Sequence, residues 1–170
     1  SRDRTLGEVA KFCGDRRVRL VVNDRNLGLA TSSNIAVTRS LGRVVVRVDA
    51  DDLLVTGAFR EAWPQLLSRV RDGEGIIYPA YTEVSEAGSM LREHADPRES
   101  HHAGGAVMSR AFLNELRFRD GLKFWEGYEL FKRASKVGSI SYWDIPIWQY
   151  RKRRGSLSEP TPERQRAKAE

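Results

Sequence analysis

Short apolar runs alternate along the chain with segments whose apolar residues recur at helical spacing. The runs predict a hairpin at residues 74–94, a strand pair or one extended segment at residues 140–151, and single strands at residues 17–23, 43–49 and 103–109. The helical spacing predicts helices, which cover residues 5–12, 29–42, 57–73, 110–116 and 121–139. Strands that alternate with helices predict an α/β domain with a mostly parallel sheet flanked by helices.

The predicted helices have signals at their ends. Gly42 and Gly73 each follow a helical segment, as expected of residues that end a helix in the left-handed conformation. Thr56 is expected to cap the helix at residues 57–73, and Pro64 to mark a turn boundary or kink in it.

Length and composition limit the class of protein. The chain has 170 residues, enough for one domain with a core of its own. It contains no run near the ~20 apolar residues of a membrane span, and its start lacks the apolar stretch of a secretory signal. The single cysteine, Cys13, excludes an internal disulfide and suits a reducing compartment. We therefore expect a cytoplasmic protein.

The basic residues are unevenly distributed. The formal net charge of +6 permits attraction to nucleic acid, phosphorylated ligands or anionic lipid without choosing among them. Residues 150–156 and 162–170 hold a disproportionate share of the positive charge, and we expect residues 156–170 to form a flexible basic tail. Contact of this segment with anionic lipid would place the protein at the inner face of the membrane.

Three aspartates follow the predicted strand at residues 43–49 almost at once. Asp49 and Asp51 lie on one side of an extended chain, and their mutual repulsion requires a cation or a hydrogen-bonding ligand. Asp52 also suits the N-terminal cap of the next helix. Because ligands of α/β sheets bind beyond the carboxyl ends of strands, the pair predicts a ligand site, and the alternative is a solvated turn.

Five segments carry recognisable motifs in order along the chain. They are NLGLATSSN at residues 26–34, VDADD at 48–52, GGAVMSR at 104–110, FWEGYELFKRASKVG at 124–138, and PIWQYRKRRGSLS at 146–158. Together they resemble glycosyltransferase family 2, of the GT-A fold, whose motifs include N-x-G-x-A-x-x-x-N and a D-x-D at the end of a strand. Each segment alone is a weak signal, whereas five in the family's order are a strong one.

The resemblance implies a Rossmann-like GT-A domain at residues 1–155 that is incomplete at its N-terminus. About the first 45 residues of the family's domain, the size of one βαβ unit, would be missing. The resemblance also implies an enzyme that moves a sugar from a nucleotide-diphosphate sugar to a hydroxyl acceptor, with inversion at the anomeric carbon. The acceptor stays open between a glycan or polysaccharide, a lipid-linked acceptor and a small molecule.

The resemblance assigns roles to individual residues. Asp51 is expected to hold a divalent metal, Mn²⁺ or Mg²⁺, and Asp49 to reach this metal, directly or through water, or to contact the ribose. Glu126 is expected to act as the catalytic base, and Trp125 to stack on the acceptor sugar, although Trp125 also suits a core position. The residues expected to bind the donor nucleotide are Asn26, Gly28, Asn34, Asp49, Gly105 and Arg151.

Three positions depart from the family's motifs. Gly127 stands where the family has the aspartate usually assigned as base, so Glu126 takes that role, with Glu129 a poorer candidate one turn later. Arg153 stands where the family has a closing histidine, and a guanidinium that stays protonated cannot ligate a metal. Ser33 replaces an arginine often found before the second asparagine.

Several segments keep a second interpretation. The glycine pair 104–105 lets the backbone approach the donor sugar, or marks a bulge in a strand. Residues 151–154 close over the diphosphate, or form a solvated basic segment that contacts an anionic membrane. His101 and His102 are weak candidates for metal ligands, because adjacent side chains diverge.

Two other classes of function compete with the glycosyltransferase. The net charge suggests a nucleic-acid-binding module, but no nucleic-acid motif is present, so we expect no nucleic-acid partner. Gly127 and the incomplete domain suggest a non-catalytic relative that folds and perhaps binds metal but turns over nothing. Metal-dependent sugar transfer is the expected function.

Overall fold

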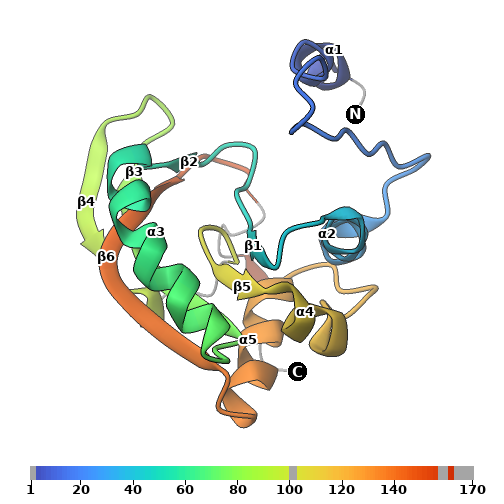
Figure 1. Cartoon of the computed structure of the whole chain (residues 1–170). Helices are drawn as coiled ribbons and strands as arrows, with labels where there is room; N and C mark the ends of the chain where they lie inside the picture. Colours follow the sequence, from blue (N-terminus) through green and yellow to red (C-terminus); the bar gives the residue numbers. More distant parts are fainter. Residues whose placement is uncertain (1–2, 100–102, 157–160, 163–170) are drawn as a thin grey trace.

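A computed structural model describes residues 3–99, 103–156 and 161–162, and shows one curved sheet with helices beside it, the first of which stands apart from the rest of the chain (Figure 1). The strands are β1 (Val44–Val46), β2 (Leu53–Leu54), β3 (Ile76–Val84), β4 (Met90–Ala95), β5 (Val107–Ser109) and β6 (Ile140–Arg151). The helices are α1 (Thr5–Ala10), α2 (Gly28–Arg39), α3 (Thr56–Arg71), α4 (Arg110–Leu116) and α5 (Glu126–Lys136), with a short 3₁₀ turn, η1, at Pro97–Glu99.

The sheet is mixed, with strand order β1-β5-β3-β6-β2 and β4 paired to β3. The α/β class is as predicted, but the prediction that the sheet is mostly parallel is wrong. Among the described strands only β3 and β6 pair in parallel. The reason is that β5 lies between β1 and β3 and runs antiparallel to both. Strands β1 and β3, which α3 connects, therefore point the same way without being neighbours.

The two longest strands form the centre of the sheet. Strand β3 pairs with β6 along one edge, and with β5 and then β4 along the other, which covers both of its edges. Apolar side chains of β3 and of its neighbours β5 and β6 form the buried core here, including Ile76, Ile77, Tyr78, Val107, Met108, Ile147 and Trp148. The predicted hairpin at residues 74–94 is confirmed as β3 and β4, and residues 140–151 form one long strand.

The strand predicted at residues 17–23 is absent. This segment is extended but belongs to no sheet, and Val22 is 56% exposed. A strand needs a partner for its backbone groups, and among the described residues no strand pairs with this segment. The segment joins α1 to α2 as an arm beside the sheet (Figure 1).

Helix ends also differ from the sequence signals. Helix α3 begins at Thr56 itself, after Val55 as the N-cap, and no side chain caps it. Pro64 lies inside α3. Helix α2 ends at Arg39, three residues before Gly42.

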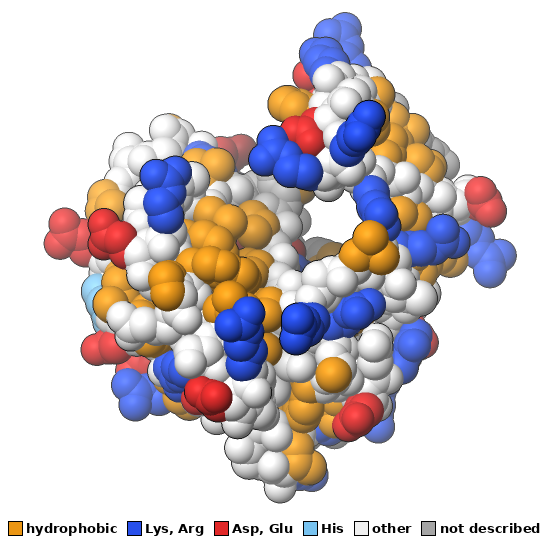
Figure 2. Space-filling view, viewed as in Figure 1, with side chains coloured by type: hydrophobic (Ala, Val, Ile, Leu, Met, Phe, Trp, Pro, Cys, Tyr) orange, Lys and Arg blue, Asp and Glu red, His pale blue; other side chains and the backbone are white. Residues whose placement is uncertain are grey.

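Positive charge is distributed over the surface. On the face shown in Figure 2, Lys and Arg side chains are spread over the body and the N-terminal arm. Among the described residues, every helix falls short of the length and apolar character that a membrane span requires.

The glycine pair before β5 has a packing role. Gly105 has φ +71°, and a Cβ there would lie 2.2 Å from the Trp148 ring. A Cβ on Gly104 would lie 3.0 Å from the same ring. The pair therefore lets β5 start directly against the buried indole of Trp148.

We predict that Gly105→Ala destabilises the protein by about 2–4 kcal/mol, because it combines a left-handed backbone with overpacking against Trp148. Gly138→Ala is the matched control, since Gly138 also has a positive φ but no atom within 4 Å of its added Cβ. It should cost only the backbone part, about 1 kcal/mol. Denaturant unfolding measures both, and equal losses would show that Trp148 sets no limit on residue 105.

Candidate active site

A cavity of about 260 Å³ lies beyond the carboxyl ends of β1 and β6, beside the start of α5. Strands β1 and β6 run in the same direction, so both ends meet at this edge of the sheet. The lining residues are Leu29, Arg47, Asp49, Ala50, Asp51, Ala103, Lys123, Phe124, Trp125, Glu126, Tyr150, Arg151, Arg153 and Ser156.

The cavity brings together five of the residues singled out from the sequence, namely Asp49, Asp51, Trp125, Glu126 and Arg151. The other residues expected at the donor are not among those that line it: Asn26, Gly28, Asn34 and Gly105. Asn26 accepts a hydrogen bond from the Gly28 N–H at 2.9 Å, which forms the turn that starts α2.

Arg47 joins the two sides of the cavity. Its Nε lies 2.9 Å from Asp49 Oδ1 and its Nη1 lies 3.0 Å from Glu126 Oε1, while its side chain is only 11% exposed. Burial opposes the charge, but the carboxylates of Asp49 and Glu126 outweigh burial and raise the pKa of Arg47. The guanidinium therefore stays charged and holds the predicted base near the acidic segment.

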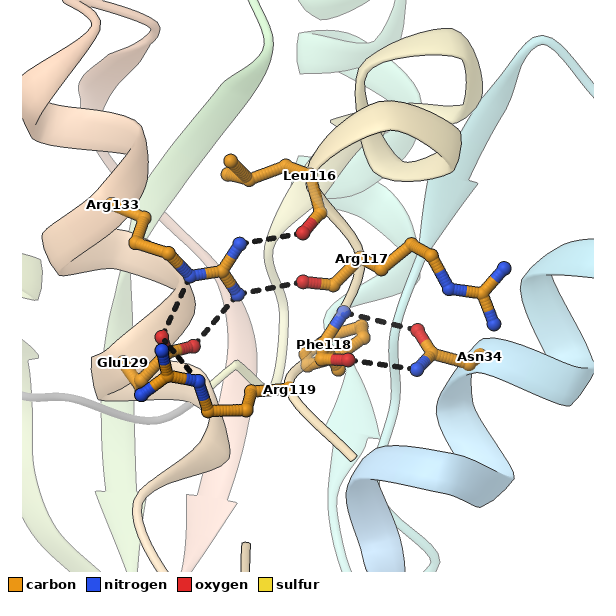
Figure 3. A network of polar contacts seen from close by, with 7 residues as sticks. All are labelled: Asn34, Leu116, Arg117, Phe118, Arg119, Glu129 and Arg133. Atoms are coloured by element: carbon orange, nitrogen blue, oxygen red, sulfur yellow. Dashed lines mark hydrogen bonds and ion pairs between the residues drawn. The ribbon is translucent and has the colours of Figure 1, made fainter. Parts of the chain in front are cut away.

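Phe118 supports Arg47, because its ring lies 5.9 Å from the guanidinium carbon. Asn34 fixes the Phe118 backbone: its amide donates to Phe118 C=O at 2.8 Å and accepts from Phe118 N–H at 3.0 Å. This pair of hydrogen bonds, seen in Figure 3, gives Asn34 a structural role in placing the residue under Arg47.

The same loop is held from α5 by Arg133. Its guanidinium donates to the carbonyls of Leu116 and Arg117 at 2.5 and 2.7 Å, and it pairs with Glu129 at 2.7 Å (Figure 3). Arg119 approaches Glu129 at 3.7 Å. Glu129, the poorer candidate for the base, is thus engaged in holding the loop and does not line the cavity.

Trp125 has a strained backbone at the cavity. It is the N-cap of α5 with φ +63° and ψ +26°, a left-handed conformation that is uncommon for a bulky residue. Such strain persists where the surrounding structure imposes it, and it is concentrated at functional sites. Here it places Trp125 and Glu126 side by side in the cavity wall.

Asp52 is buried beneath the acidic segment, with 7% of its surface exposed. It does not cap α3, which was its alternative interpretation; instead its Oδ1 accepts the backbone N–H of Arg151 at 2.9 Å. Burial, with a contribution from the negative charges of Asp49 and Asp51, raises the pKa of Asp52 to about 7. Asp52 thus ties the acidic segment to the end of β6.

The basic residues 151–153, which begin at the last residue of β6, have different partners. Arg151 donates from Nε to the Asp51 carbonyl at 3.0 Å and from Nη1 to the Glu86 carbonyl at 2.9 Å. Arg153 pairs with the Asp51 carboxylate at 2.5 Å. Lys152 instead pairs with Glu83 at 2.6 Å. Residues 151 and 153 therefore belong to the cavity, whereas Lys152 does not line it.

Few side chains of the cavity could ligate a metal ion. Among the described residues, no group of three or more His, Cys, Asp or Glu side chains is placed to hold one, and His101 and His102 lie outside the described residues. The carboxylates of Asp51 and Asp49 are nevertheless hard oxygen donors in the cavity. Both oxygens of Asp49 accept hydrogen bonds from Arg47, at 2.9 and 3.3 Å, so Asp51 is the carboxylate that better fits a cation. Such a cation would take its remaining ligands from water and phosphate, as Mg²⁺ commonly does, and not from a cage made by protein alone.

Sequence reasoning missed Arg47 and Lys123. The signal for Arg47 was present: a charged residue within an apolar strand, two positions before the first aspartate, needs buried carboxylates as partners. No such signal was present for Lys123, because it lies in a polar segment at the start of a predicted helix.

The model of the glycosyl transferase family 2 domain matches residues 1–94 of the chain, more than half of its length. The chain belongs to glycosyl transferase family 2. Comparison with curated proteins gave no match.

Solved structures similar to this family 2 chain include TarS from S. aureus. A crystal structure of TarS 1–349 in complex with UDP-GlcNAc has a TM-score of 0.73 and 19% identity, covering 95% of this chain and 50% of TarS 1–349. A second structure of TarS 1–349 has a TM-score of 0.66 and 17% identity, covering 89% of this chain and 48% of the other. This chain thus spans about half of TarS 1–349, and the likeness confirms the GT-A fold.

We predict that Arg47→Met lowers the free energy of unfolding by about 2–4 kcal/mol, because it leaves the largely buried carboxylate of Glu126 and the partly exposed one of Asp49 without their counter-ion. Arg43→Met, an exposed arginine just before the same strand, should change it by no more than about 0.5 kcal/mol. Urea unfolding of both variants provides the measurement. Similar values for the two would show that Arg47 does not hold the cavity together.

The raised pKa of Asp52 predicts a pH-dependent stability. Because the folded protein binds this proton more tightly than the unfolded chain, the contribution of Asp52 is fully present below about pH 4 and is lost as the pH rises through about 7. Asp52→Asn keeps an oxygen for the Arg151 N–H and cannot ionise. With a chelator present, the stability of the variant relative to the wild type should rise between about pH 4 and pH 7, by at most about 1.4 kcal/mol per pH unit, and level off above pH 7. A constant difference would contradict the assignment.

Proposed function

We propose that this protein transfers a sugar from a nucleotide-diphosphate sugar to a hydroxyl acceptor, with a divalent metal and with inversion. The observation that carries the proposal is the placement of Asp51 and Glu126 in the wall of one cavity. The Asp51 carboxylate would hold the metal that binds the diphosphate, and the Glu126 carboxylate would accept the proton of the acceptor hydroxyl. Membership of family 2 and the likeness to TarS, whose structure contains UDP-GlcNAc, support a nucleotide sugar as the donor.

The charge of the cavity suits a diphosphate. Four cationic side chains, Arg47, Lys123, Arg151 and Arg153, face three acidic ones, Asp49, Asp51 and Glu126. The lining therefore has a positive balance in a partly enclosed space, which concentrates the field and attracts an anionic ligand. A solvated basic surface would not need carboxylates at its centre.

Asp51, with Asp49 directly or through water, would hold Mn²⁺ or Mg²⁺ against the diphosphate, while Asp49 also suits a contact to the ribose. When bound, such a cation neutralises negative charge on the leaving diphosphate. Arg151 is fixed beside it by its own hydrogen bonds to backbone carbonyls, so its position is set before the donor arrives.

Glu126 would be the base. Its Oε1 accepts a hydrogen bond from Arg47, so we assign Oε2 as the atom that takes the proton of the acceptor hydroxyl. As the proton leaves, the acceptor oxygen forms a bond to the anomeric carbon. The bond from that carbon to the diphosphate oxygen breaks, and the diphosphate keeps the electron pair. A single displacement of this kind inverts the anomeric carbon.

The acceptor side of the cavity is aromatic. Phe124, Trp125 and Tyr150 line it, and flat ring faces suit the apolar face of a sugar. We propose a glycan, lipid-linked or small hydroxyl acceptor, no nucleic-acid partner, and action in the cytoplasm. The basic C-terminal segment would let the protein work at the inner face of the membrane.

An activity assay with the full chain tests the proposal. UDP- and GDP-sugars are incubated with Mn²⁺ and a panel of hydroxyl acceptors, and release of nucleoside diphosphate is measured. Glu126→Gln should lower the rate about 10²–10⁴-fold with little change in nucleotide affinity, as expected for loss of a base. Glu115→Gln, at an exposed position of α4 that does not line the cavity, is the control and should retain most of the activity.

Two results would contradict the proposal in different ways. A Glu126→Gln variant as active as the wild type would show that Glu126 is not the base. Metal-dependent nucleotide binding without release of diphosphate from any donor would identify a non-catalytic relative, as the glycine at position 127 suggests.

A further inference from the structure

Arg153 occupies the carboxylate that the proposed function assigns to the metal. Its Nε lies 2.5 Å from Asp51 Oδ2, and the two residues are 102 positions apart in the sequence. The contact is therefore made by the fold, which brings the residues after β6 across the end of β1. The contact places a cationic side chain against the Asp51 carboxylate. A histidine at position 153 could ligate a metal beside Asp51, whereas an arginine cannot.

The guanidinium of Arg153 competes with a divalent cation for Asp51. A charged hydrogen bond places the nitrogen about 2.7–2.9 Å from a carboxylate oxygen, and a metal ion lies about 2.0–2.6 Å from its oxygen ligand. Two cations held this close to one carboxylate repel one another. The ion pair between Arg153 and Asp51 Oδ2 therefore weakens cation binding at Asp51, and it must open for the cation to take Oδ2.

Fewer contacts hold the side chain of Arg153 than that of Arg151. Arg151 is held through its backbone N–H by Asp52, through Nε by the Asp51 carbonyl and through Nη1 by the Glu86 carbonyl. The side chain of Arg153 is 50% exposed and lies two residues beyond the end of β6. Within the described part of the chain, its side-chain hydrogen bond goes to Asp51 alone.

We propose that Arg153 is an exchangeable counter-ion: it neutralises Asp51 in the ligand-free protein and moves to the diphosphate when cation and nucleotide bind together. This inference rests on the proposed function. The incoming diphosphate supplies both the new partner for Arg153 and oxygen ligands for the cation, so each ligand favours the other. Arg153 thus makes the cation bind weakly by itself and tightly with the nucleotide.

The test compares Arg153→Gln with Lys152→Gln. Both remove one positive charge from adjacent residues, but only the first releases Asp51, since Lys152 pairs with Glu83. Binding of Mn²⁺ without nucleotide is measured by electron paramagnetic resonance of the free ion on the full chain. Binding of UDP and of GDP is then measured by calorimetry at saturating Mn²⁺.

We expect Arg153→Gln to bind Mn²⁺ alone at least tenfold more tightly than the wild type, and the better of the two nucleotides at least tenfold more weakly. Lys152→Gln should change both affinities by less than twofold. Adding Asp51→Asn to Arg153→Gln should abolish the gained Mn²⁺ binding, which locates it. Unchanged or weaker Mn²⁺ binding in Arg153→Gln, or no Mn²⁺ binding by any form, would overturn the proposal.

The outcome is separable from that of the proposed function. Sugar transfer by the wild type with no effect of Arg153→Gln on Mn²⁺ affinity would reject the counter-ion and leave the enzyme in place. Tighter Mn²⁺ binding by Arg153→Gln, without turnover of any nucleotide sugar by the wild type, would keep the counter-ion and reject the enzyme.

Discussion

The buried guanidinium of Arg47 is the interaction on which the cavity depends. It binds Asp49, which follows β1, and Glu126, which begins α5, so two segments far apart in the sequence are fixed relative to each other. Without a cation between them, the largely buried carboxylate of Glu126 and the partly exposed one of Asp49 would repel one another. The strained Trp125 at the start of α5 and the acidic segment after β1 are held in one site because this charge is paired.

The fold places Arg47 through a second layer of contacts. Asn34 on α2 and Arg133 on α5 bind the backbone of the loop at residues 116–119 from two sides, and this loop presents Phe118 to Arg47. The directions of the strands also matter. Because β1 and β6 end at the same edge of the sheet, Arg151 and Arg153 lie beside the aspartates. The chemistry proposed for the cavity therefore follows from packing in the whole domain.

Local patterns predicted most elements, the α/β class and the family, because these depend on spacing and motifs within short segments. These patterns failed where the structure of a segment depends on a partner that is distant in the sequence. Residues 17–23 have a strand-like composition but no described strand pairs with them, and the strand directions depend on β5 being inserted between β1 and β3. At the cavity, the aspartates and Glu126 were found from motifs. The pairings of Arg47 and Arg153, and the contact of Asn34 with Phe118, required the folded chain.

The central claim is that the cavity at Asp51 is a metal-dependent site for a nucleoside diphosphate. Calorimetric titration of UDP and GDP into the full chain, with and without Mn²⁺, tests it most directly when repeated with Asp51→Ala. We predict that at least one of the two nucleotides binds, that this binding requires Mn²⁺, and that it is lost in Asp51→Ala. Binding that is equally tight without Mn²⁺ and in Asp51→Ala would contradict it.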